Sequence, residues 1–460
     1  MTKPAFHPIE ALRAKVPLSR PGDPGYAAAT SIWARPSGPG PVAVAHCRTA
    51  ADVREAVRAA RKHGLPLSVR AGGHDWAGRA LCTGVVIDLT PMRAVIVEED
   101  RSAVRMGGGT LARDLFPVTD PIGRAVVTGT VGAVGMGGFT LGGGYGALIG
   151  RFGLALDNLL SAEVVLADGS FVVANDRSNP ELFWALRGGG GNFGVVTGMR
   201  HRLHPLAKVY TGMILYPVEQ AEAVLTGSAE LLASAGDDLT AQVGFISGPS
   251  GEPMIFITPT WCGAPDEGEQ RVAPLTRLGT PLVANLNASP PGMANTLFDA
   301  HIVNGLRVYM ETRTLPSLSR GAIAALIDSI ATRPSPGCFA VTHEFRGAPA
   351  RVPVEATAFG LRSEHVVVEL VAVTDSDSDA EAHRAWAKAT SEALAPFARP
   401  GGYANFLVDD DPERVRASFG PNAGRLALAK RRYDPDNVFA RAIPLPAHQT
   451  EEPVPSRKRA

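Results

Sequence analysis

The chain has 460 residues, and its 45 lysines and arginines balance 45 aspartates and glutamates, so its formal net charge is zero. This length allows two or three lobes with full-sized cores, and the balanced charge argues against nucleic acid or an anionic membrane as a partner. The N-terminus has no apolar core of signal-peptide type, and no apolar run approaches the ~18 residues of a membrane span. We therefore expect a cytoplasmic protein without membrane contact.

Four cysteines are spread widely along the chain and form no CxxC pair and no metal-type spacing. In a chain of this length such cysteines are typical of buried free thiols, so we expect neither a disulfide framework nor a bound metal. The four are Cys47, Cys82, Cys262 and Cys338.

Residues 41–207 alternate short strand patterns with helical ones, which predicts an α+β unit. The clearest helix runs from Thr49, which suits an N-cap, to Gly64, a typical stop. A hairpin is expected around Asp168-Gly169, because this turn dipeptide separates two apolar runs. The other expected elements are a short helix within 1–40, strands at 41–47, 65–74, 84–92 and 103–109, and a helix, glycine turn and strand over 181–206.

Residues 208–395 lack the glycine clusters of the first part and predict a second α+β lobe, with one sheet covered by helices. The expected strands are 241–248, 254–261, 339–345 and 365–373, and the expected helices are 221–236, 320–333 and 380–397. The segment 396–460 follows, and its tail, 453–460, is expected to be disordered.

The first glycine cluster, RAGGHDWAG at 70–78, follows a predicted strand. A turn without side chains at Gly72 and Gly73 can present successive backbone N–H groups to an anion such as pyrophosphate. His74 follows at once and is held close to whatever the turn binds. Taken alone, the segment fits equally well a tight turn beside a surface histidine.

The second cluster covers residues 128–146, of which nine of nineteen are glycine. So many glycines would weaken a core helix or strand by about 0.5–1 kcal/mol each, relative to alanine. A flexible linker is the alternative, but the apolar residues between the glycines, such as Val134 and Phe139, argue against it. The cluster therefore predicts backbone packed against a large flat ligand that carries phosphates.

The third cluster, RGGGGNFGVVT at 187–197, formally matches GxGxxG at Gly189, Gly191 and Gly194. A dinucleotide-binding motif should follow a strand and open a helix, whereas this one follows a helix and opens a strand. We therefore do not predict a dinucleotide fold, although this backbone can still line a cofactor.

Together these segments resemble the FAD-linked oxidases of the vanillyl-alcohol-oxidase (PCMH) superfamily, and within it the berberine-bridge-enzyme-like branch and the bacterial 6-hydroxynicotine oxidases. The resemblance implies an α+β protein with a two-lobed PCMH-type FAD-binding domain at 1–207, a substrate domain with a helix-covered antiparallel sheet at 208–395, and a segment at 396–460 that returns to the FAD domain. The motifs that carry it are SVRAGGHDWAG, GVVIDLTPM, residues 127–159, LADGS, ELFWALRGGGGNFGVVT, YANF and RYDPDNVF.

The resemblance also implies how FAD is held. The family's RxGGHxxxG histidine matches His74, which implies a covalent bond to the 8α-methyl group of the flavin. Many relatives attach FAD a second time through a cysteine, and the matching residue here is Val131, which implies a single histidyl link. Asn405 matches the asparagine of the family's YxN motif beside the flavin, Val196 a position near the adenine, and Asn437 a motif that supports the FAD lobe. The other implied FAD-binding positions are Arg70, Ala71, Gly72, Gly73, Asp75, Gly78, Thr130, Val134, Gly135, Gly138, Gly142, Gly143 and Gly144.

Candidates for catalysis follow from the second lobe, whose sheet covers the flavin in this family. Strand alternation places Glu344 on one face and His343 on the other. Relatives often contact substrate through a carboxylate or lysine of this strand, so Glu344 is the candidate base or amine anchor, with a solvated surface glutamate as the alternative. Tyr309 is a similar inward-facing candidate. Tyr403, near the YxN asparagine, is the other candidate base, with a structural tyrosine as the alternative.

The expected function is that of an FAD-dependent oxidase, acting as a monomer or homodimer. A small organic donor, such as an amine, an N-heterocycle or a secondary alcohol, would pass hydride to flavin N5, with O2 as acceptor giving H2O2. A flavin-dependent dehydrogenase or oxidative cyclase, and a non-catalytic flavin-binding protein, are the alternatives.

Overall fold

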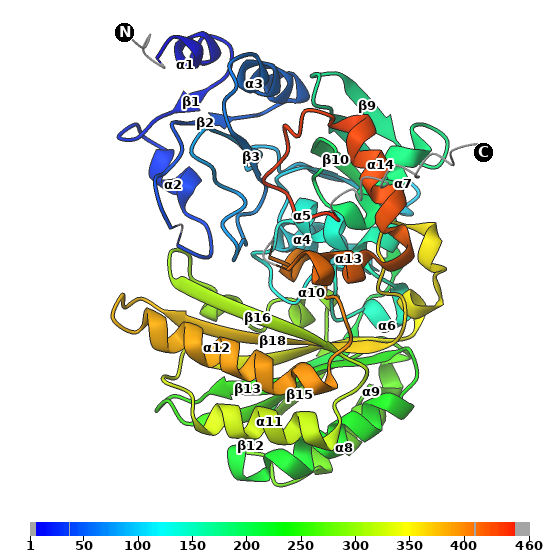
Figure 1. The fold of residues 1–460 in the computed structure, drawn as a ribbon. Coiled ribbons are helices and arrows are strands. Elements are labelled where there is room, and N and C mark those ends of the chain that lie inside the picture. The colour runs from blue at the N-terminus through cyan, green and yellow to red at the C-terminus, as the bar shows by residue number, and fades with distance from the viewer. Residues whose placement is uncertain (1–5, 36, 409–410, 447–460) are drawn as a thin grey trace, which may run out of the picture.

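The computed structural model of the chain describes residues 6–35, 37–408 and 411–446. Two lobes pack against each other, and the N-terminal and C-terminal segments meet in the first of them (Figure 1). The expected α+β class is confirmed. The predicted disordered tail lies outside the described residues.

The first lobe begins with a four-stranded sheet in the order β1-β2-β4-β3, whose last three strands are parallel. Helix α3 (Ala50–Lys62) packs on it and is capped as expected, because the Thr49 hydroxyl accepts the N–H of Asp52 and Gly64 follows at φ +61°. The other elements here are α1 (Phe6–Arg13), β1 (Leu18–Ser19), α2 (Tyr26–Thr30), β2 (Ala43–His46), β3 (Leu67–Arg70) and β4 (Val85–Asp88).

A five-stranded antiparallel sheet in the order β5-β6-β10-β8-β9 completes the first lobe. The predicted hairpin is β8-β9, which turns at Gly169 with φ +78°. The elements are β5 (Val95–Val97), β6 (Ala103–Gly107), α4 (Ala112–Thr119), β7 (Arg124–Ala125), α5 (Met136–Gly142), α6 (Ile149–Phe152), β8 (Leu159–Val165), β9 (Phe171–Ala174), α7 (Pro180–Gly189), β10 (Val195–Arg202) and β11 (His204–Pro205).

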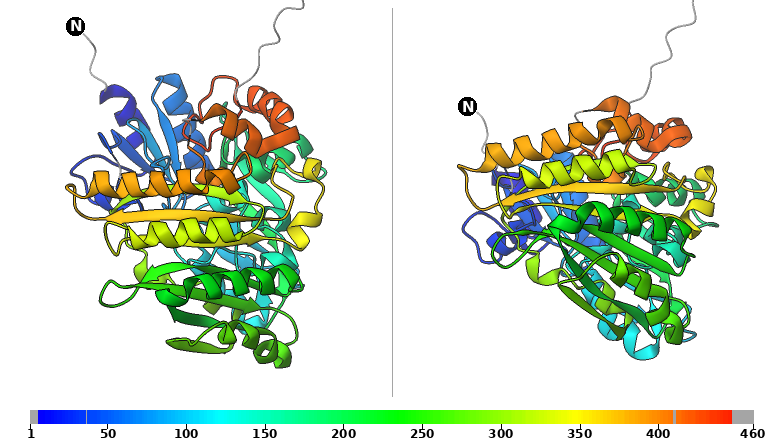
Figure 2. Two further views of the ribbon diagram at one scale, coloured as in Figure 1. Left: turned by 60° about the horizontal axis from the view of Figure 1, so that its bottom comes forward. Right: turned by 90° about the horizontal axis from the view of Figure 1, so that it is seen from below.

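The second lobe is a seven-stranded antiparallel sheet in the order β15-β12-β14-β13-β17-β18-β16. Helices α8, α11 and α12 lie side by side on one face and bury an apolar core against it (Figure 2). The other face is turned toward the first lobe. The elements are β12 (Val209–Pro217), α8 (Ala221–Ser234), β13 (Leu239–Ser247), β14 (Pro253–Trp261), α9 (Gly268–Val272), β15 (Val283–Ser289), α10 (Pro291–Ala294), β16 (Arg307–Leu315), α11 (Arg320–Ala331), β17 (Cys338–Phe345), β18 (His365–Thr374) and α12 (Ala380–Leu394).

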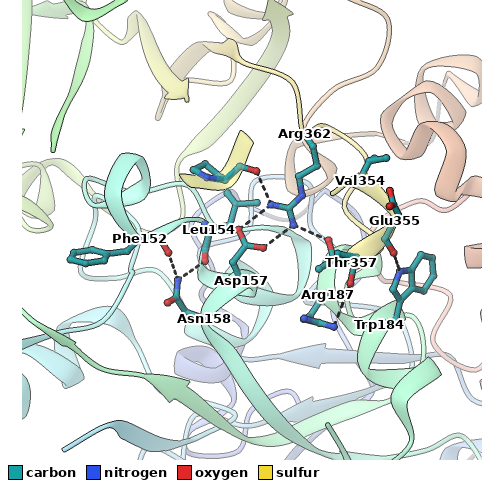
Figure 3. A network of polar contacts seen from close by, with 12 residues as sticks. Phe152, Leu154, Asp157, Asn158, Trp184, Arg187, Val354, Glu355, Thr357 and Arg362 are labelled. Atoms are coloured by element: carbon teal, nitrogen blue, oxygen red, sulfur yellow. Dashed lines mark hydrogen bonds and ion pairs between the residues drawn. The ribbon is translucent and has the colours of Figure 1, made fainter. Parts of the chain in front are cut away.

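A buried ion pair fastens the loop between β17 and β18 to the first lobe (Figure 3). The guanidinium of Arg362 donates to both carboxylate oxygens of Asp157, at 3.0 and 2.8 Å, and to the Thr357 hydroxyl at 2.8 Å. Arg362 is only 6% exposed, so its charge needs this partner.

The C-terminal segment returns to the first lobe through α13 (Pro412–Phe419) and α14 (Ala423–Tyr433), the latter beside α7 (Figure 1). Arg425 pairs with Glu181 of α7 at 2.7 Å. All four cysteines are buried free thiols, as expected. Within the described part of the chain, no helix has the length and apolar character needed to cross a membrane.

Candidate active site

Segments far apart in the sequence surround a cavity of about 350 Å³ between the lobes. The first lobe contributes all three glycine clusters, including residues 71–75, 129–131, 134–135 and 190–191. The second lobe contributes side chains from β16, β17 and β18, and the C-terminal segment contributes Tyr403, Asn405 and residues 441–443. The glycine clusters that the sequence singled out therefore meet at one site.

The first two clusters pack backbone against backbone. A methyl group on Gly72 would lie 2.6 Å from the Cα of Gly135, and one on Gly135 would lie 2.5 Å from the nitrogen of Gly72. Real Cβ atoms do not approach so closely, so both positions require glycine for the loops to meet. The contact holds the residue 73–75 turn beside the start of α5.

Other glycines are open to the cavity instead. A Cβ built on Gly138 or on Gly191 meets no protein atom within 4 Å, although both residues line the cavity. The site therefore has a tightly packed glycine frame and a side-chain-free surface above it. This shape suits a large planar group with phosphates, which backbone N–H groups can bind.

His74 lies in the cavity wall with its ring orientation fixed. The imidazole stacks on the Trp33 indole, with ring centroids 4.5 Å apart and an interplanar angle of 13°. The backbone N–H of Trp33 donates to the Gly73 carbonyl at 2.9 Å, which ties the stack to the turn. Desolvation lowers the pKa of His74 to about 4, so the imidazole is neutral at pH 7 and keeps a nucleophilic nitrogen.

Tyr403 and Asn405 form the cavity wall where the C-terminal segment crosses α5. The Tyr403 hydroxyl accepts the Gly144 N–H at 2.9 Å and the Asn405 side-chain N–H at 2.8 Å. Methyl groups on Gly142 and Gly143 would overlap the Asn405 amide and the Tyr403 ring, respectively. Gly142 and Gly143 thus leave room for this segment, and the Gly144 N–H binds it. That these three glycines also contact the flavin stays a prediction.

Three polar side chains form a row on the cavity side of the second-lobe sheet. His343 of β17 has its Nε2 2.6 Å from Oε1 of Glu369 on β18. The Gln242 amide nitrogen of β13 lies 3.2 Å from Nδ1 of the same ring. His343 and Glu369 both line the cavity.

The catalytic candidates Glu344 and Tyr309 lie elsewhere. Alternation along β17 holds, but it is His343 that faces the cavity, whereas Glu344 lines a separate space of about 20 Å³. Tyr309 of β16 packs on the helix-covered face, where the Arg384 guanidinium lies over its ring, and its neighbour Met310 lines the cavity. On β16 it is therefore Met310 that faces the cavity, whereas on β17 Glu344 shares the small space with His343 and with Tyr145 of the first lobe. A catalytic role for Glu344 or Tyr309 stays a prediction.

Comparison with known proteins agrees with this geometry. The family profile described as an FAD binding domain matches residues 41–175, and the profile described as berberine and berberine like matches residues 402–444. (R)-6-hydroxynicotine oxidase of Paenarthrobacter nicotinovorans is 31% identical over 445 residues, which cover 91% of this chain and 94% of that protein. An FAD-linked oxidoreductase of Aspergillus terreus is 30% identical over 455 residues and 91% of each chain.

The fold comparison gives the same result. The crystal structure of 6-hydroxy-D-nicotine oxidase from Arthrobacter nicotinovorans matches with a TM-score of 0.85 at 29% identity, over 94% of this chain and 98% of that one. The chain belongs to this berberine-bridge-enzyme-like family of FAD-linked oxidoreductases. It is therefore an FAD-dependent oxidoreductase, and the resemblance found from the sequence motifs is confirmed.

Most of the FAD positions inferred from the family line the cavity of this oxidoreductase. They are Ala71, Gly72, Gly73, His74, Asp75, Thr130, Val134, Gly135, Gly138, Val196 and Asn405.

Besides Gly142, Gly143 and Gly144, three inferred FAD positions do not line the cavity. They are Arg70, Gly78 and Asn437. The Arg70 guanidinium contacts Asp88 at 3.5 Å and the Ser31 carbonyl at 3.3 Å instead of lining the cavity. The Gly78 carbonyl accepts from Arg441, which does line it. Asn437 adopts φ +50° in the turn that leads into this cavity-lining C-terminal stretch.

Several residues that line the cavity were not predicted from the sequence. Trp33 comes from an N-terminal stretch without a motif, and Ile443 follows the last recognisable motif. His343 and Glu369 carried a usable signal, because both are polar residues within apolar strand patterns. The sequence did not show which face of the sheet they occupy.

Proposed function

We propose that the protein is an oxidase whose FAD is attached through a single covalent bond to His74. The observation that carries the proposal is the place of the His74 imidazole, which stacks on Trp33 in the wall of a glycine-lined cavity. A ring nitrogen must be unprotonated to form the bond, and desolvation keeps it so. Val131 lines the same cavity and offers no nucleophile for a second bond.

FAD supplies the hydride acceptor and, through reaction with O2, the route to H2O2. The chain's own residues have the task of placing the donor carbon and removing a proton. Tyr403 and Asn405 would orient the donor from the C-terminal side of the cavity. The donor is a small amine, N-heterocycle or secondary alcohol, and the name of the relative 6-hydroxynicotine oxidase supports the N-heterocycle. We further propose a cytoplasmic monomer or homodimer.

Flavin fluorescence after denaturing gel electrophoresis tests the attachment. The wild-type band should fluoresce, the His74→Ala band should not, and the matched control His63→Ala, at an exposed histidine after α3, should match wild type. A fluorescent His74→Ala band would refute the assignment of the attachment site.

Oxygen consumption tests the oxidase assignment. A donor that bleaches the flavin without oxygen should, in air, consume O2 and release H2O2 in equal amounts. Bleaching that is reversed only by an artificial acceptor would favour a dehydrogenase or oxidative cyclase. A flavin that no amine or alcohol bleaches would favour a non-catalytic flavin-binding protein.

A further inference from the structure

One edge of the second-lobe sheet is an exposed strand. β15 (Val283–Ser289) forms this edge and, within the described part of the chain, pairs only with β12 on its inner side. Most of its side chains are exposed on both faces of the sheet, and Leu282 and Val283 are 58% and 45% exposed. The unpaired backbone groups of such an edge strand can bind a strand of another chain.

The β15 edge lacks the charged side chains that usually prevent strand pairing between molecules. Residues 278–298 contain no aspartate, glutamate, lysine or arginine. The pairing of β15 with β12 runs in one register over all seven residues, so no bulge twists the edge away. The opposite edge strand, β16, carries Arg307, Glu311 and Arg313. Of the two edges of this sheet, β15 is therefore the one suited to a partner strand.

The structure shows which backbone groups of β15 are free to pair. A Cβ built on Gly212 of β12 would meet the Asn285 carbonyl, so this carbonyl is turned toward β12. Along a strand the N–H and C=O groups of successive residues point to alternate sides. Those of Ala284, Leu286 and Ala288 therefore point away from the sheet, where a further strand can bind them.

The sequence of β15 reads the same in both directions about Leu286. Residues 284–288 are Ala-Asn-Leu-Asn-Ala, and Leu286 is also the midpoint of the strand. An antiparallel second copy centred on Leu286 places every outward N–H and C=O group opposite a partner. Pro281 and Pro290 flank the strand and have no N–H, so a shifted copy would lose pairs at the strand ends. One register is therefore favoured, and it is two-fold symmetric.

The asparagines of β15 complement each other in this register. Asn285 of one copy lies opposite Asn287 of the second copy, in a pair whose backbones do not hydrogen-bond to each other, where side chains come closest. The Asn287 Oδ1 accepts from the Ser289 hydroxyl, which leaves its side-chain N–H groups to donate to Asn285 of the second copy. The strand carries no charge, so like charges do not meet along it. The β15 edge is thus complementary to itself.

We propose that two copies of this chain form a homodimer in which β15 pairs antiparallel with β15 of the second copy across a two-fold axis at Leu286. The two seven-stranded sheets then form one continuous sheet. The cavity is lined by β16, β17 and β18, which are the last three strands in the sheet order, so each cavity stays complete within one chain. Pairing of seven residues is a small interface, so the dissociation constant should lie in the micromolar range. The dimer depends neither on FAD nor on the proposed oxidase function.

Sedimentation velocity over a range of protein concentrations tests the dimer and its register. Wild type should shift from the mass of one chain to that of two. The lysine variant, Asn285→Lys with Asn287→Lys, sets lysines opposite lysines and should raise the dissociation constant about 2- to 30-fold. The matched control, Asn285→Lys with Asn287→Glu, sets opposite charges face to face and should dimerise at least as tightly as wild type. Both residues are exposed, so neither variant should disturb the fold.

Amide hydrogen exchange locates the contact. A peptide covering residues 282–290 should exchange more slowly at high than at low wild-type concentration, because the outward N–H groups become hydrogen-bonded, and this difference should vanish in the lysine variant. The control peptide covers β9 (Phe171–Ala174), the exposed edge of another sheet, and should not change. A wild type that stays monomeric, even if another protein binds its β15, would overturn the proposal, as would a lysine variant that dimerises like wild type. If the lysine–glutamate control were as weak as the lysine variant, the two-fold register would be wrong.

Discussion

Substitution of Gly138 tests where FAD binds, because it should weaken FAD binding without disturbing the packing of the protein itself. It lies within α5, lines the cavity, and a methyl group there would meet no protein atom within 4 Å. Alanine is better than glycine in a helix interior by about 0.5–1 kcal/mol, so Gly138→Ala should leave the flavin-free protein as stable or slightly more stable. The same methyl group would project into the space assigned to FAD. Overpacking of one methyl costs about 1–3 kcal/mol, which corresponds to about 5- to 150-fold weaker FAD binding.

The assay is a flavin fluorescence titration in a His74→Ala background, where binding is reversible, combined with thermal unfolding of the flavin-free protein. Gly424→Ala is the matched control, because a methyl there also meets nothing within 4 Å but lies on the exposed start of α14. It should leave FAD binding unchanged and, like Gly138→Ala, leave stability equal or slightly higher. Gly72→Ala should behave oppositely to Gly138→Ala and lower the stability of the flavin-free protein, since its methyl meets the Gly135 backbone. FAD binding by Gly138→Ala as tight as in the control would refute the placement of FAD on α5.

Three further outcomes are expected. Arg362→Met should lower the unfolding free energy by about 3–5 kcal/mol in denaturant titrations, because it leaves the Asp157 carboxylate buried without its partner. Burial lowers the pKa of His201 to about 3, below its unfolded value, so the unfolded chain binds more protons. The unfolding free energy is therefore unaffected by His201 above about pH 6.5 and falls by about 4 kcal/mol as the pH is lowered toward 3. His201→Gln should flatten this dependence of the unfolding free energy on pH. Trp33→Ala should slow covalent flavin attachment about 2- to 13-fold in a gel-fluorescence time course, and Trp33→Phe should restore it, because stacking on His74 contributes about 0.5–1.5 kcal/mol.

The sequence predicted those parts of the fold whose signals are local. Thr49 and Gly64 mark the ends of α3 because capping depends on residues within one turn of the helix. The glycine clusters predicted a ligand-facing backbone because glycine in such numbers is costly elsewhere. For the same reason Gly72, Gly135 and Gly138 were all assigned to one ligand. Whether each glycine serves the ligand or another part of the chain was not readable.

Whether a glycine faces the ligand or another part of the chain depends on contacts between distant segments. Gly142 and Gly143 make room for Tyr403 and Asn405, about 260 residues later in the chain. Trp33, which fixes the His74 ring, belongs to a segment whose neighbours share no periodic pattern. Neither contact has a signature in the local sequence, so one chain without aligned relatives could not have revealed them.

The sequence could not show which alternate residues of β17 face the cavity, and the reason is physical. An amphipathic strand reveals its buried face by its apolar residues, but both faces of this sheet are covered, one by helices and the other by the first lobe. Both sets of alternate residues in β17 therefore mix apolar and polar residues, with Thr342 and Glu344 in one set and His343 in the other. Only packing decides the outcome: Ala340 lies in the core beneath the helices, whereas Phe345 packs against Tyr145 and Tyr403 of the first lobe. Residues two apart share a face, so Phe345 places His343 in the cavity, whereas Glu344 lines only the smaller neighbouring space that it shares with His343 and Tyr145.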